Sequence, residues 1–592
     1  MIYIDYSMSN HKAIIKSESD IDEIKWAHIR RIIEDNSQMI DYIDNYTLSI
    51  PWWCFLNIRN ELVKSLRIYK IKIFLSEKVK ELLIKAQQHE KHFLNTDFSN
   101  IISQDEIREM LREKGFLREL TKQQFRNVYH LIRYPASATF SVPGAGKTTE
   151  ALAYYYLKKN TSDKLLVVSP RNAFASWEEE IKYCIPIFTP SVVRLQGSEK
   201  IKGLLEQNYD IFLITYQQFY RVDAIISDFL QKNVCFMFLD ESHRIKRGYS
   251  GVHGSSILSV CHLPKYKLIM SGTPLPNAIE DLIPQFIYLY PEIFFTPLNV
   301  VNYIQNLYVR TTKNELGLKP PVRQQWILDM NPAQRSLFDN IISETRRRIE
   351  GLSLNDRVLY QEIGKCIVRL IQVTTDPALL INTEIRNTSL LQDAVDEGPG
   401  VKIQEACHLA RKLASEDEKS IIWTQFVNTV ETVADMLSDL NAEYIHGGIE
   451  TDEDEENYAS RESVIKRFHD DASCMVLVAN PAACAEGISL HKVCHNAIYI
   501  DRNYNAAHYL QSEDRIHRLG LKPEDDTFIH ILTCRNSIDD SISKRLEFKI
   551  SRMGEVLNDR QLSVEPIQII DEISGLTFED IEDIKKLIMG DT

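Results

Sequence analysis

The sequence predicts an α/β fold in which two parallel-sheet units follow one another along the chain. Short β-rich runs alternate with helix-like segments from Lys164 onward, which is the pattern of parallel strands joined by crossover helices. At 592 residues, the chain also exceeds the size that a single hydrophobic core normally organises. More than one domain is therefore expected.

The strands of these units are expected in two series. The first series consists of residues 165–169, 211–216, 235–239 and 267–271. The second consists of residues 420–424, 443–446, 475–479, 497–500 and 528–532. Between the two series, residues 331–391 have a helical pattern, and the turn formers Gly398-Pro399 mark the loop that leads into the second unit.

The patterns divide the chain into five expected segments. They are an α+β accessory domain of residues 1–115, a first lobe of residues 116–330, a helical linker of residues 331–400, a second lobe of residues 401–550 and an acidic C-terminal tail of residues 551–592. The accessory domain contains Trp52 and Trp53, whose rings are of a kind that stacks on nucleic-acid bases. Because the apolar run Cys54-Phe55-Leu56 follows them, we expect both tryptophans in the core instead.

The composition is typical of a soluble protein without membrane segments. Hydrophobic residues make up 44% and charged residues 26% of the chain. Acidic residues follow Met1 too early for a secretory signal, and no apolar run approaches the roughly 20 residues that span a bilayer. We expect a cytoplasmic protein of prokaryotic or viral origin, or a nuclear one if the source is eukaryotic. The 10 cysteines include no C-x-x-C pair, which disfavours a zinc ribbon and a disulfide framework.

The most informative motif runs from Ser141 to Thr149 and reads Ser-Val-Pro-Gly-Ala-Gly-Lys-Thr-Thr. Glycines followed by Lys-Thr and a helix supply backbone N–H donors, a lysine and a metal-binding hydroxyl at one point, as in nucleoside triphosphate sites. Ser141 stands where the usual pattern has its first glycine, and we expect this change to be harmless. The expected ATP-binding residues of the loop are Gly144, Ala145, Gly146, Lys147, Thr148 and Thr149.

Two acidic residues follow a strand of the same unit. Asp240 and Glu241 come directly after the apolar residues 235–239, in the sequence Asp-Glu-Ser-His. In that position, Asp240 and the hydroxyl of Thr148 are expected to hold Mg²⁺, and Glu241 to orient and deprotonate the attacking water. The spacing therefore predicts a site for ATP hydrolysis.

Two further motifs belong to the same chemistry. Residues 271–277, Ser-Gly-Thr-Pro-Leu-Pro-Asn, again follow a strand, and residues 511–520 place Gln511, Arg515 and Arg518 on neighbouring turns of an expected helix. Arginines that approach the γ-phosphate from a second domain raise the rate by roughly 10³ to 10⁵ in well-studied cases. We therefore expect these three residues to be catalytic, together with Asp240 and Glu241.

In this order, the motifs resemble those of the Swi/Snf-type ATPases of helicase superfamily two, which have a DEAD/DEAH-like core. The resemblance extends from about residue 116 to residue 548 and includes further matching segments at 120–124, 170–180, 309–313, 369–380, 423–426, 445–448, 461–468, 487–490 and 501–505. It implies two tandem RecA-like lobes with helical insertions, with ATP and Mg²⁺ as cofactors.

The resemblance also implies roles for single residues. Gln124 would read adenine, and Gly487 would belong to the nucleotide-binding residues. Nucleic acid would cross the two lobes and be held by its phosphates, so that binding is largely independent of sequence and sensitive to salt. The matches to the nucleic-acid motifs are Arg171, Thr215, Tyr216 and Gln425. For Thr215 and Tyr216, at a strand end, a capping or core role explains the residue equally well.

The chain departs from the family pattern at several positions. Ser242 replaces the alanine of Asp-Glu-Ala-His, a change that should leave the metal and water chemistry intact. Ser489 stands in place of an asparagine, the glycines expected near Cys484 and Ala485 are absent, and Leu521 replaces a glutamine. These departures leave open how strongly ATP hydrolysis is coupled to nucleic acid and which substrate is preferred. They bear less on hydrolysis itself.

Three functions fit the sequence. The first is an ATP-driven translocase that tracks double-stranded DNA by opening and closing of its lobes, with RNA as an alternative track. The second is the same motor as a subunit of a bacterial or viral antiviral-defence or restriction system whose nuclease is another chain. The third is a non-catalytic scaffold, which the complete set of hydrolytic residues disfavours. Because the net charge is −14, nucleic acid would have to bind in a local basic groove. His469-Asp470-Asp471 has the pattern of a solvated turn, not of a phosphohydrolase site.

Overall fold

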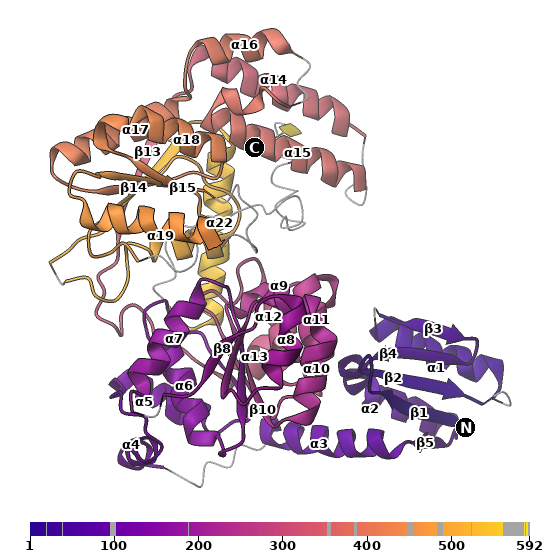
Figure 1. Ribbon diagram of the computed structural model, residues 1–592. Helices are drawn as coiled ribbons and strands as arrows, with labels where there is room; N and C mark the ends of the chain where they lie inside the picture. The colour runs from indigo at the N-terminus through magenta and orange to yellow at the C-terminus, as the bar shows by residue number, and fades with distance from the viewer. Residues whose placement is uncertain are drawn as a thin grey trace. The chain divides into compact units, whose positions relative to one another are not determined.

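The computed structural model describes residues 1–18, 21–37, 39–94, 102–187, 189–351, 357–383, 387–446, 455–481, 489–522, 524–559, 585, 588 and 589. Its contacts divide the chain into two compact units, Met1–Thr311 and Thr312–Thr592. Figure 1 shows that each unit contains a parallel sheet with helices packed around it.

The first unit begins with a small mixed sheet of order β3-β4-β2-β1-β5. In it, β1 is antiparallel to β2 and parallel to β5. The elements of this part are β1 (Ile2–Ser7), β2 (Lys12–Ser17), α1 (Glu23–Asn36), β3 (Asp41–Asp44), β4 (Thr47–Pro51), α2 (Trp52–Ile68), β5 (Ile73–Leu75) and α3 (Glu77–Leu94). Trp52 and Trp53 are 1% and 8% exposed, so both belong to the core, as expected.

The second sheet of the first unit is wholly parallel, with the order β12-β6-β11-β10-β7-β9-β8. Its strands are β6 (Ala136–Thr139), β7 (Lys164–Val168), β8 (Val192–Arg194), β9 (Ile211–Ile214), β10 (Cys235–Asp240), β11 (Tyr266–Met270) and β12 (Tyr308–Val309). The helices are α4 (Gln104–Glu113), α5 (Lys122–Leu131), α6 (Lys147–Lys158), α7 (Ala173–Cys184), α8 (Ser198–Leu205), α9 (Tyr216–Arg221), α10 (Asp223–Lys232), α11 (Val252–Ser259), α12 (Leu282–Leu289) and α13 (Val300–Ile304). The central strands are buried along almost their whole length, as is typical of a parallel sheet covered on both faces.

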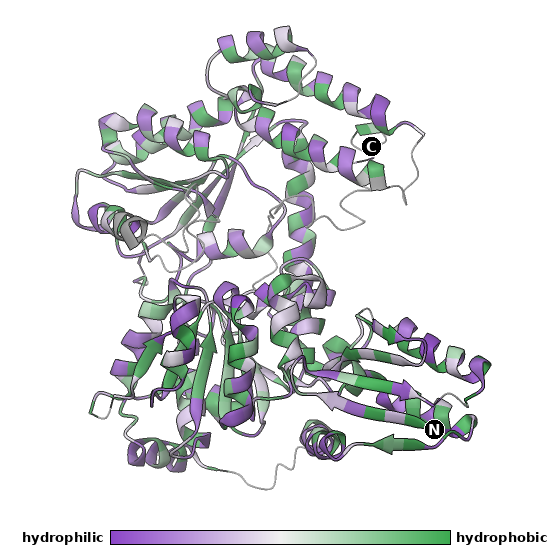
Figure 2. Cartoon of the chain, turned by 45° about the vertical axis from the view of Figure 1, so that its right-hand side comes forward, coloured by the Kyte–Doolittle hydropathy of each residue, from purple (hydrophilic) through white to green (hydrophobic). Residues whose placement is uncertain are grey.

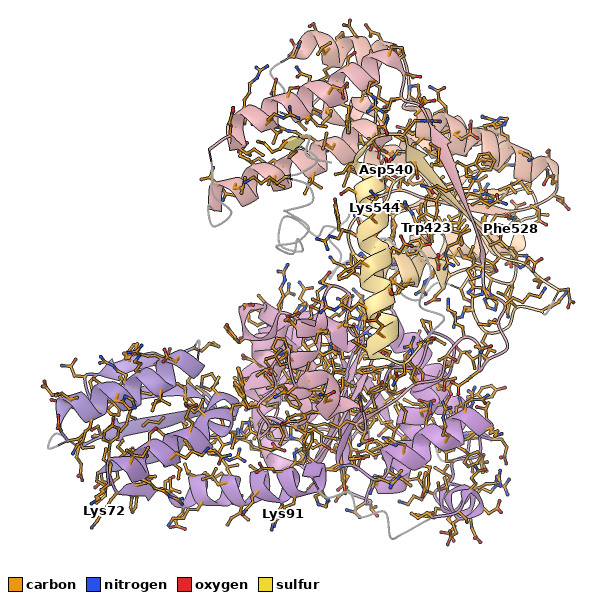
Figure 3. The ribbon with its side chains drawn as sticks, turned by 180° about the vertical axis from the view of Figure 1, so that it is seen from behind. Lys72, Lys91, Trp423, Phe528, Asp540 and Lys544 are labelled. Atoms are coloured by element: carbon orange, nitrogen blue, oxygen red, sulfur yellow. The ribbon has the colours of Figure 1, made fainter. Side chains whose placement is uncertain are left out.

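The second unit contains a parallel sheet of order β13-β18-β17-β14-β16-β15. Its strands are β13 (Val322–Leu328), β14 (Ser420–Trp423), β15 (Glu443–Ile445), β16 (Val476–Ala479), β17 (Asn496–Tyr499) and β18 (Phe528–Cys534). The helices are α14 (Pro332–Ile349), α15 (Arg357–Thr375), α16 (Thr388–Asp396), α17 (Val401–Ser415), α18 (Val427–Met436), α19 (Glu455–Asp470), α21 (Ala506–Glu513) and α22 (Ile538–Val556). Figure 3 marks Trp423 at the end of β14 and Phe528 at the start of β18.

Every strand of the two predicted series is present, within two residues of its expected bounds. The predicted α/β class with parallel sheets is therefore confirmed. The strands β6, β8, β12 and β13 have no counterpart in the predicted series. β6 reads Ala-Ser-Ala-Thr and β12 has two residues, so neither contains a β-rich run that sequence patterns can detect.

The expected segment boundaries stay predictions, and one of them differs from the sheet pairing. The strand β13 pairs with β18 in the sheet of the second unit, although the sequence pattern places the end of the first lobe at residue 330. Exposed and half-buried side chains alternate along β13, as fits an edge strand. Such a strand carries no pattern that indicates which sheet it joins. The helical pattern of residues 331–391 corresponds to α14, α15 and α16.

Apolar side chains concentrate inside both units. Figure 2 shows hydrophobic strands in the parallel sheets and hydrophilic residues on the outer faces of the helices. In the first unit, Tyr154, Tyr155 and Trp177 join α6 and α7 to the core of the sheet. Within the described ranges, no helix has both the length and the apolar composition needed to cross a bilayer.

Candidate ATP-binding site

The phosphate-binding loop connects β6 to the N-terminus of α6. The residue that caps this helix, Gly146, has a φ of 84°, and Gly144 has a φ of 85°. Both values lie in the left-handed region, where residues with a Cβ are strained. The turn places the first N–H groups of α6, which have no partner within the helix, at the end of the sheet where a phosphate can bind.

Gln124 lies against this loop. Its Nε2 donates to the carbonyl oxygen of Ala145 at 3.3 Å, and its Oε1 accepts from the N–H of Thr121 at 2.9 Å. Thr121 Oγ1 accepts from the N–H of Gln124 at 3.2 Å, which completes a capping box at the start of α5. In this arrangement Gln124 supports the loop, and its assignment to adenine recognition stays a prediction.

The substitution Gly146→Ala is expected to lower the thermal stability and to weaken ATP binding. A Cβ at this position would lie 2.2 Å from Gln124 Nε2, on a backbone with a φ of +84°. The strain is worth about 1–3 kcal/mol. Gly203→Ala is the control, because a Cβ there meets no atom within 4 Å. Thermal unfolding and titration with ATP measure both effects, and equal results for the two variants would contradict the expectation.

The residues that follow Gly146 have different surroundings. Lys147 Nζ donates to the carbonyl oxygen of Ser141 at 2.9 Å. Thr149 is 1% exposed, and its hydroxyl donates to Glu180. Thr148 is partly exposed. Thr148 is therefore better placed than Thr149 to offer a hydroxyl to a metal ion. The group that Thr149 can offer to a phosphate is its backbone N–H.

Ser141 joins the loop to the last residue of the first unit. Its side chain is fully buried, and its Oγ accepts from the N–H of Thr311 at 3.0 Å. In return, the N–H of Val142 donates to the carbonyl oxygen of Thr311 at 3.0 Å. Asn127 Nδ2 donates to Ser141 Oγ at 3.3 Å and to Thr311 Oγ1 at 2.9 Å. The serine in place of glycine therefore has a structural role that the motif does not reveal.

Glu150 is a buried carboxyl beneath the loop, and sequence reasoning missed it. It accepts from Asn127 Nδ2 at 2.7 Å and from Thr139 Oγ1 at 2.8 Å. Burial raises the pKa of Glu150 to about 7, although both hydrogen bonds and the charge of Lys147 act in the opposite direction. An acidic residue in the first turn of a helix is normally explained by the helix dipole and exposed, so the sequence offers no signal of this inward position.

Asp240 and Glu241 lie at the end of β10. Asp240 accepts from Trp177 Nε1 and from the N–H of Glu241, both at 3.0 Å. Burial, followed by the neighbouring charge of Glu241, raises the pKa of Asp240 to about 6. Burial also favours the neutral form of Glu241, but His243 and nearby cations outweigh it and lower the pKa of Glu241 to about 2. Glu241 is thus held ionised, the state that a general base requires.

The donor set at this strand end suits Mg²⁺. This ion prefers oxygen ligands and is usually bound through one or two carboxylates together with phosphate oxygens. Asp240 and Glu241 are adjacent acidic groups, and the raised pKa of Asp240 reflects the cost of holding its charge in a buried position beside a second carboxylate. A divalent cation held by Asp240 and Thr148 would offset that cost. These two residues remain the candidates for the metal.

His243 connects Glu241 to the segment that follows β11. Its Nδ1 lies 3.3 Å from Glu241 Oε2 and 3.1 Å from Ser271 Oγ. The Ser271 hydroxyl also accepts from the N–H of Thr273 at 3.1 Å. His243 therefore links the motif of residues 271–277 to the proposed catalytic base, Glu241.

Ser242 makes a second connection to the same segment. It is fully buried and donates to Gln285 Oε1 at 2.7 Å. Gln285 Nε2 donates to the carbonyl oxygens of Pro274 at 2.6 Å and Asp281 at 2.7 Å. Sequence reasoning missed Gln285, although a lone amide among the apolar and aromatic residues of α12 is a usable signal.

The substitution Ser242→Ala is expected to destabilise the first unit by about 1–3 kcal/mol, because Gln285 Oε1 loses its donor in a buried position. Urea unfolding measures the change. Ser250→Ala is the matched control, since the hydroxyl of Ser250 bonds to a carbonyl oxygen at the surface. If the two variants unfolded at the same urea concentration, the Ser242–Gln285 bond would have no net stabilising role.

The remaining catalytic candidates belong to the second unit. Gln511 lies in α21 and is 3% exposed. Arg515 and Arg518 follow the helix in a series of turns, so the prediction of neighbouring helical turns is wrong for them. The helix ends because the N–H groups of Arg515 and Ile516 bond to carbonyl oxygens three residues back, at Ser512 and Glu513. Arg515 is 8% exposed, and Arg518 is more exposed.

Two ion pairs fix the segment where α21 ends. Arg323 of β13 contacts Glu513 at 2.8 Å, and Lys313 Nζ lies 2.6 Å from Asp514 Oδ1. Burial favours the neutral form of Glu513, but the charge of Arg323 prevails and lowers the pKa of Glu513. Arg515 Nε donates to a carbonyl oxygen of α21 at 2.8 Å. The segment that carries Arg515 and Arg518 is therefore held in place by Arg323 and Lys313, which are distant in the sequence.

The four nucleic-acid candidates have unlike surroundings. Thr215 caps α9 by accepting from a backbone N–H of that helix at 3.0 Å. Tyr216 is 2% exposed, and its hydroxyl donates to the carbonyl oxygen of Asp240 at 2.8 Å. These two side chains thus have the capping and core roles that the sequence allows. Arg171 and Gln425 are partly exposed, and Gln425 Nε2 has no hydrogen-bond partner among the described residues.

Some predicted features lie outside the described residues. They are Gly487, Cys484, Ala485, residues 447 and 448 of the matching segment 445–448, and most of the C-terminal segment after residue 559. The assignment of Gly487 to the nucleotide site therefore stays a prediction.

Family models match both units. The model of the SNF2-related domain matches residues 141–300, and that of the helicase conserved C-terminal domain matches residues 401–520. In both ranges the chain is similar to the Swi/Snf-type ATPases of helicase superfamily two. The first match contains the phosphate loop and Asp240-Glu241, and the second contains Gln511, Arg515 and Arg518.

The relatives of this chain are distant in sequence. The transcription regulatory protein SNF2 of Saccharomyces cerevisiae is 22% identical over 458 residues, which cover 70% of this chain and 26% of the relative. The SWI/SNF chromatin-remodeling complex subunit snf22 of Schizosaccharomyces pombe is 23% identical over 461 residues, with the same coverage of 70% and 26%. The Sulfolobus solfataricus SWI2/SNF2 ATPase core, solved in complex with dsDNA, is 19% identical with a TM-score of 0.32, covering 79% of this chain and 97% of that chain. The chain thus spans 26% of the length of these two curated relatives.

Proposed function

We propose that this Swi/Snf-type ATPase hydrolyses ATP and uses the cycle to move along double-stranded DNA. One observation carries the proposal: the phosphate loop, Asp240-Glu241 and residues 271–277 follow three strands of one parallel sheet at the same end. His243 and Ser242 connect Asp240-Glu241 to residues 271–277, the first through Ser271 and the second through Gln285. The relatives support the link to DNA, since their names place them in transcription regulation and chromatin remodelling.

In this proposal, the N–H groups of the loop and Lys147 bind the phosphates of ATP. Mg²⁺, when bound by Asp240 and Thr148, would neutralise charge on the phosphate oxygens. Glu241 accepts a proton from the attacking water, whose oxygen bonds to the γ-phosphorus as the bond to the β–γ bridging oxygen breaks. The products are ADP and inorganic phosphate.

The second unit contributes charge that couples hydrolysis to movement. Gln511, Arg515 and Arg518 are proposed to act on the γ-phosphate only in the ATP-bound state, so that each turnover includes a closing and an opening step. Arg171 and Gln425 are proposed to contact DNA phosphates, which makes the motor indifferent to base sequence. The five segments expected from the sequence are part of this proposal, except that β13 is assigned to the second lobe.

The test is the ATP hydrolysis rate of the purified chain with single-stranded DNA, duplex DNA, forked DNA and RNA side by side. We expect duplex DNA to stimulate turnover most, and the stimulation to fall steeply as salt rises, because phosphate contacts release counterions. Turnover that no nucleic acid changes at any salt concentration would contradict the proposal. A larger response to RNA would keep the motor and change its track.

The alternative is the same motor as a subunit of a bacterial or viral antiviral-defence or restriction system. It shares the ATP chemistry and differs in its partner. Stable copurification of a nuclease chain favours this alternative, and a partner-free protein that translocates on duplex DNA favours the first.

A further inference from the structure

A cavity lies at the end of the first unit's parallel sheet that is opposite to the ATP site. The strands β10 and β11 end at the catalytic motifs, whereas their first residues, Cys235 and Tyr266, line this cavity. Its volume is about 720 Å³. Sites for small molecules typically have about 300–1,000 Å³. The cavity is therefore separate from the phosphate loop and large enough for a molecule of nucleotide size.

The lining is strongly cationic. The lysines and arginines that line the cavity are Lys85, Arg133, Lys158, Lys232, Lys265 and Lys267. Among the described residues of the lining, Glu292 is the one carboxylate. Since the whole chain has a net charge of −14, this local excess of positive charge does not follow from composition. A concave, cationic surface of this kind attracts anions.

Local partners account for some of these cations. Lys85 pairs with Glu81 at 2.7 Å, and Lys232 pairs with Asp228 at 2.5 Å. Lys158 and Lys232 also stand in the last turns of α6 and α10, where a cation is favoured by the helix dipole. Lys265 and Lys267 lie at the start of β11, outside any helix, and no ion pair joins either of them to a carboxylate of the described residues. Burial lowers the pKa of Lys267 and the charge of Glu292 acts in the opposite direction, so the uncompensated cation of the two is Lys265, whose side chain is exposed.

The inner wall contains polar groups with unused bonding capacity. Lys267 is 3% exposed, and its Nζ donates to the carbonyl oxygens of Cys261 at 3.1 Å and Tyr288 at 2.9 Å, which uses two of its three donors. His262 Nε2 bonds to Tyr6 at 2.8 Å, whereas His262 Nδ1 is shielded from solvent and has no partner within the described chain. Since Nδ1 cannot be reached by solvent, it adds nothing to the cavity surface, and the third donor of Lys267 is the polar group of the inner wall that is left for a ligand.

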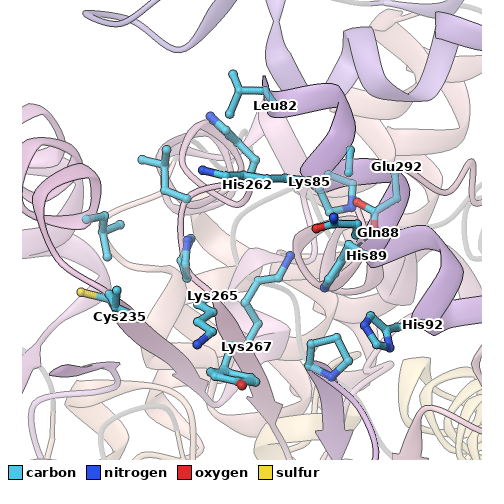
Figure 4. Close-up of a pocket in the computed structure, with 18 of the residues that line it drawn as sticks. Leu82, Lys85, Gln88, His89, His92, Cys235, His262, Lys265, Lys267 and Glu292 are labelled. Carbon is cyan, nitrogen blue, oxygen red and sulfur yellow. Dashed lines mark hydrogen bonds and ion pairs between the residues drawn. The ribbon is translucent and has the colours of Figure 1, made fainter. Parts of the chain in front are cut away.

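Two different parts of the first unit build the site. Figure 4 shows Leu82, Lys85, His89 and His92 of α3 on one side of the space, and Lys265 and Lys267 on the other. His89 is itself bound to Glu292, which ties α3 to the turn that follows α12. Tyr266 is partly exposed and adds aromatic surface, whereas Trp52 and Leu82 of the lining are buried. The lining thus combines cations for phosphates with flat surface for a ring.

We propose that this cavity is a second anion site, which binds a small phosphate-bearing molecule of about nucleotide size. Its occupant bridges α3 and the parallel sheet, and so holds the accessory part of the first unit in place. The site is distinct from the ATP site, because it lies at the other end of the same strands and shares no residue with the phosphate loop.

The test uses the full chain with Lys147→Ala, so that the phosphate loop contributes little to anion binding. The probes are inorganic pyrophosphate and adenosine 3′,5′-bisphosphate, titrated by calorimetry at low salt. We expect one-to-one binding of at least one probe, and a loss of affinity of about tenfold or more with Lys265→Glu. Lys91→Glu is the matched control: Lys91 is exposed on α3 (Figure 3) and does not line the cavity, so binding should stay within about twofold.

Hydrogen exchange of the chain without the pocket substitutions gives a second measurement. The bound probe should slow exchange in residues 82–92 of α3 and in residues 262–267. The proposal is overturned if neither probe binds at millimolar concentration, or if Lys265→Glu and Lys91→Glu weaken binding equally. It is also overturned if a duplex DNA displaces the probe, because the cavity is then part of a nucleic-acid surface.

Discussion

Glu241→Gln is expected to lower the ATP turnover rate by about 10²–10⁴-fold and to leave ATP affinity within about twofold. The amide has nearly the shape of the carboxylate but cannot accept a proton from water. In the unsubstituted chain, His243 and nearby cations lower the pKa of Glu241 to about 2, so the base is ionised at neutral pH. Phosphate release at saturating ATP measures turnover, and titration with a fluorescent ATP analogue measures binding.

The control for this variant is Glu280→Gln. Glu280 is an exposed glutamate of the same unit, near the motif of residues 271–277. Its replacement should change neither turnover nor affinity. Turnover by Glu241→Gln within tenfold of the unsubstituted chain would remove Glu241 from the role of base. A parallel loss of ATP binding would instead show that the side chain shapes the site.

Arg518→Ala is expected to lower turnover by about 10³-fold or more if Arg518 supplies charge to the γ-phosphate. Of the two arginines, Arg518 gives the result that is easier to interpret. Arg515 is 8% exposed and its Nε is bonded to a carbonyl oxygen of α21, so its removal also disturbs the local structure. The turnover rate is measured with saturating ATP and duplex DNA, beside the affinity for ATP and the unfolding midpoint.

Two further variants make this result specific. Arg535→Ala removes an exposed arginine of the same unit that pairs with Asp329, and it should leave turnover unchanged. Arg518→Lys keeps the charge and loses the planar fork, so partial activity is expected. If Arg518→Ala turned over ATP as fast as Arg535→Ala, the second unit would not contribute Arg518 to hydrolysis.

The strands that could be predicted from the sequence are those that are buried on both faces. Runs such as residues 211–214 and 235–239 are apolar throughout because helices cover both sides of a parallel sheet. β6 consists of small residues, and β13 is an edge strand whose side chains alternate in exposure. Neither has a composition that distinguishes it from a loop, so only the three-dimensional pairing shows them.

The candidate site divides in the same way. Lys147, Asp240 and Glu241 could be predicted because their chemistry depends on short, local spacing. The roles of Ser141 and Gln285 could not, because their partners lie far away in the chain: Ser141 bonds to Thr311, 170 residues downstream. The expectation for Ser242 concerns only the metal and water chemistry, and the motif gives no sign of the buried acceptor of its hydroxyl. Such contacts depend on the folded arrangement and leave no local pattern.

The bonds between the phosphate loop and Thr311 have a further consequence. Thr311 is the last residue of the first unit, and both its N–H and its carbonyl oxygen are bound to residues 141 and 142. Any shift of the loop on nucleotide binding would therefore displace the residue from which the chain continues into the second unit. The backbone at Thr311 would then be a covalent route for a signal from the nucleotide, one that needs no contact between the surfaces of the two units.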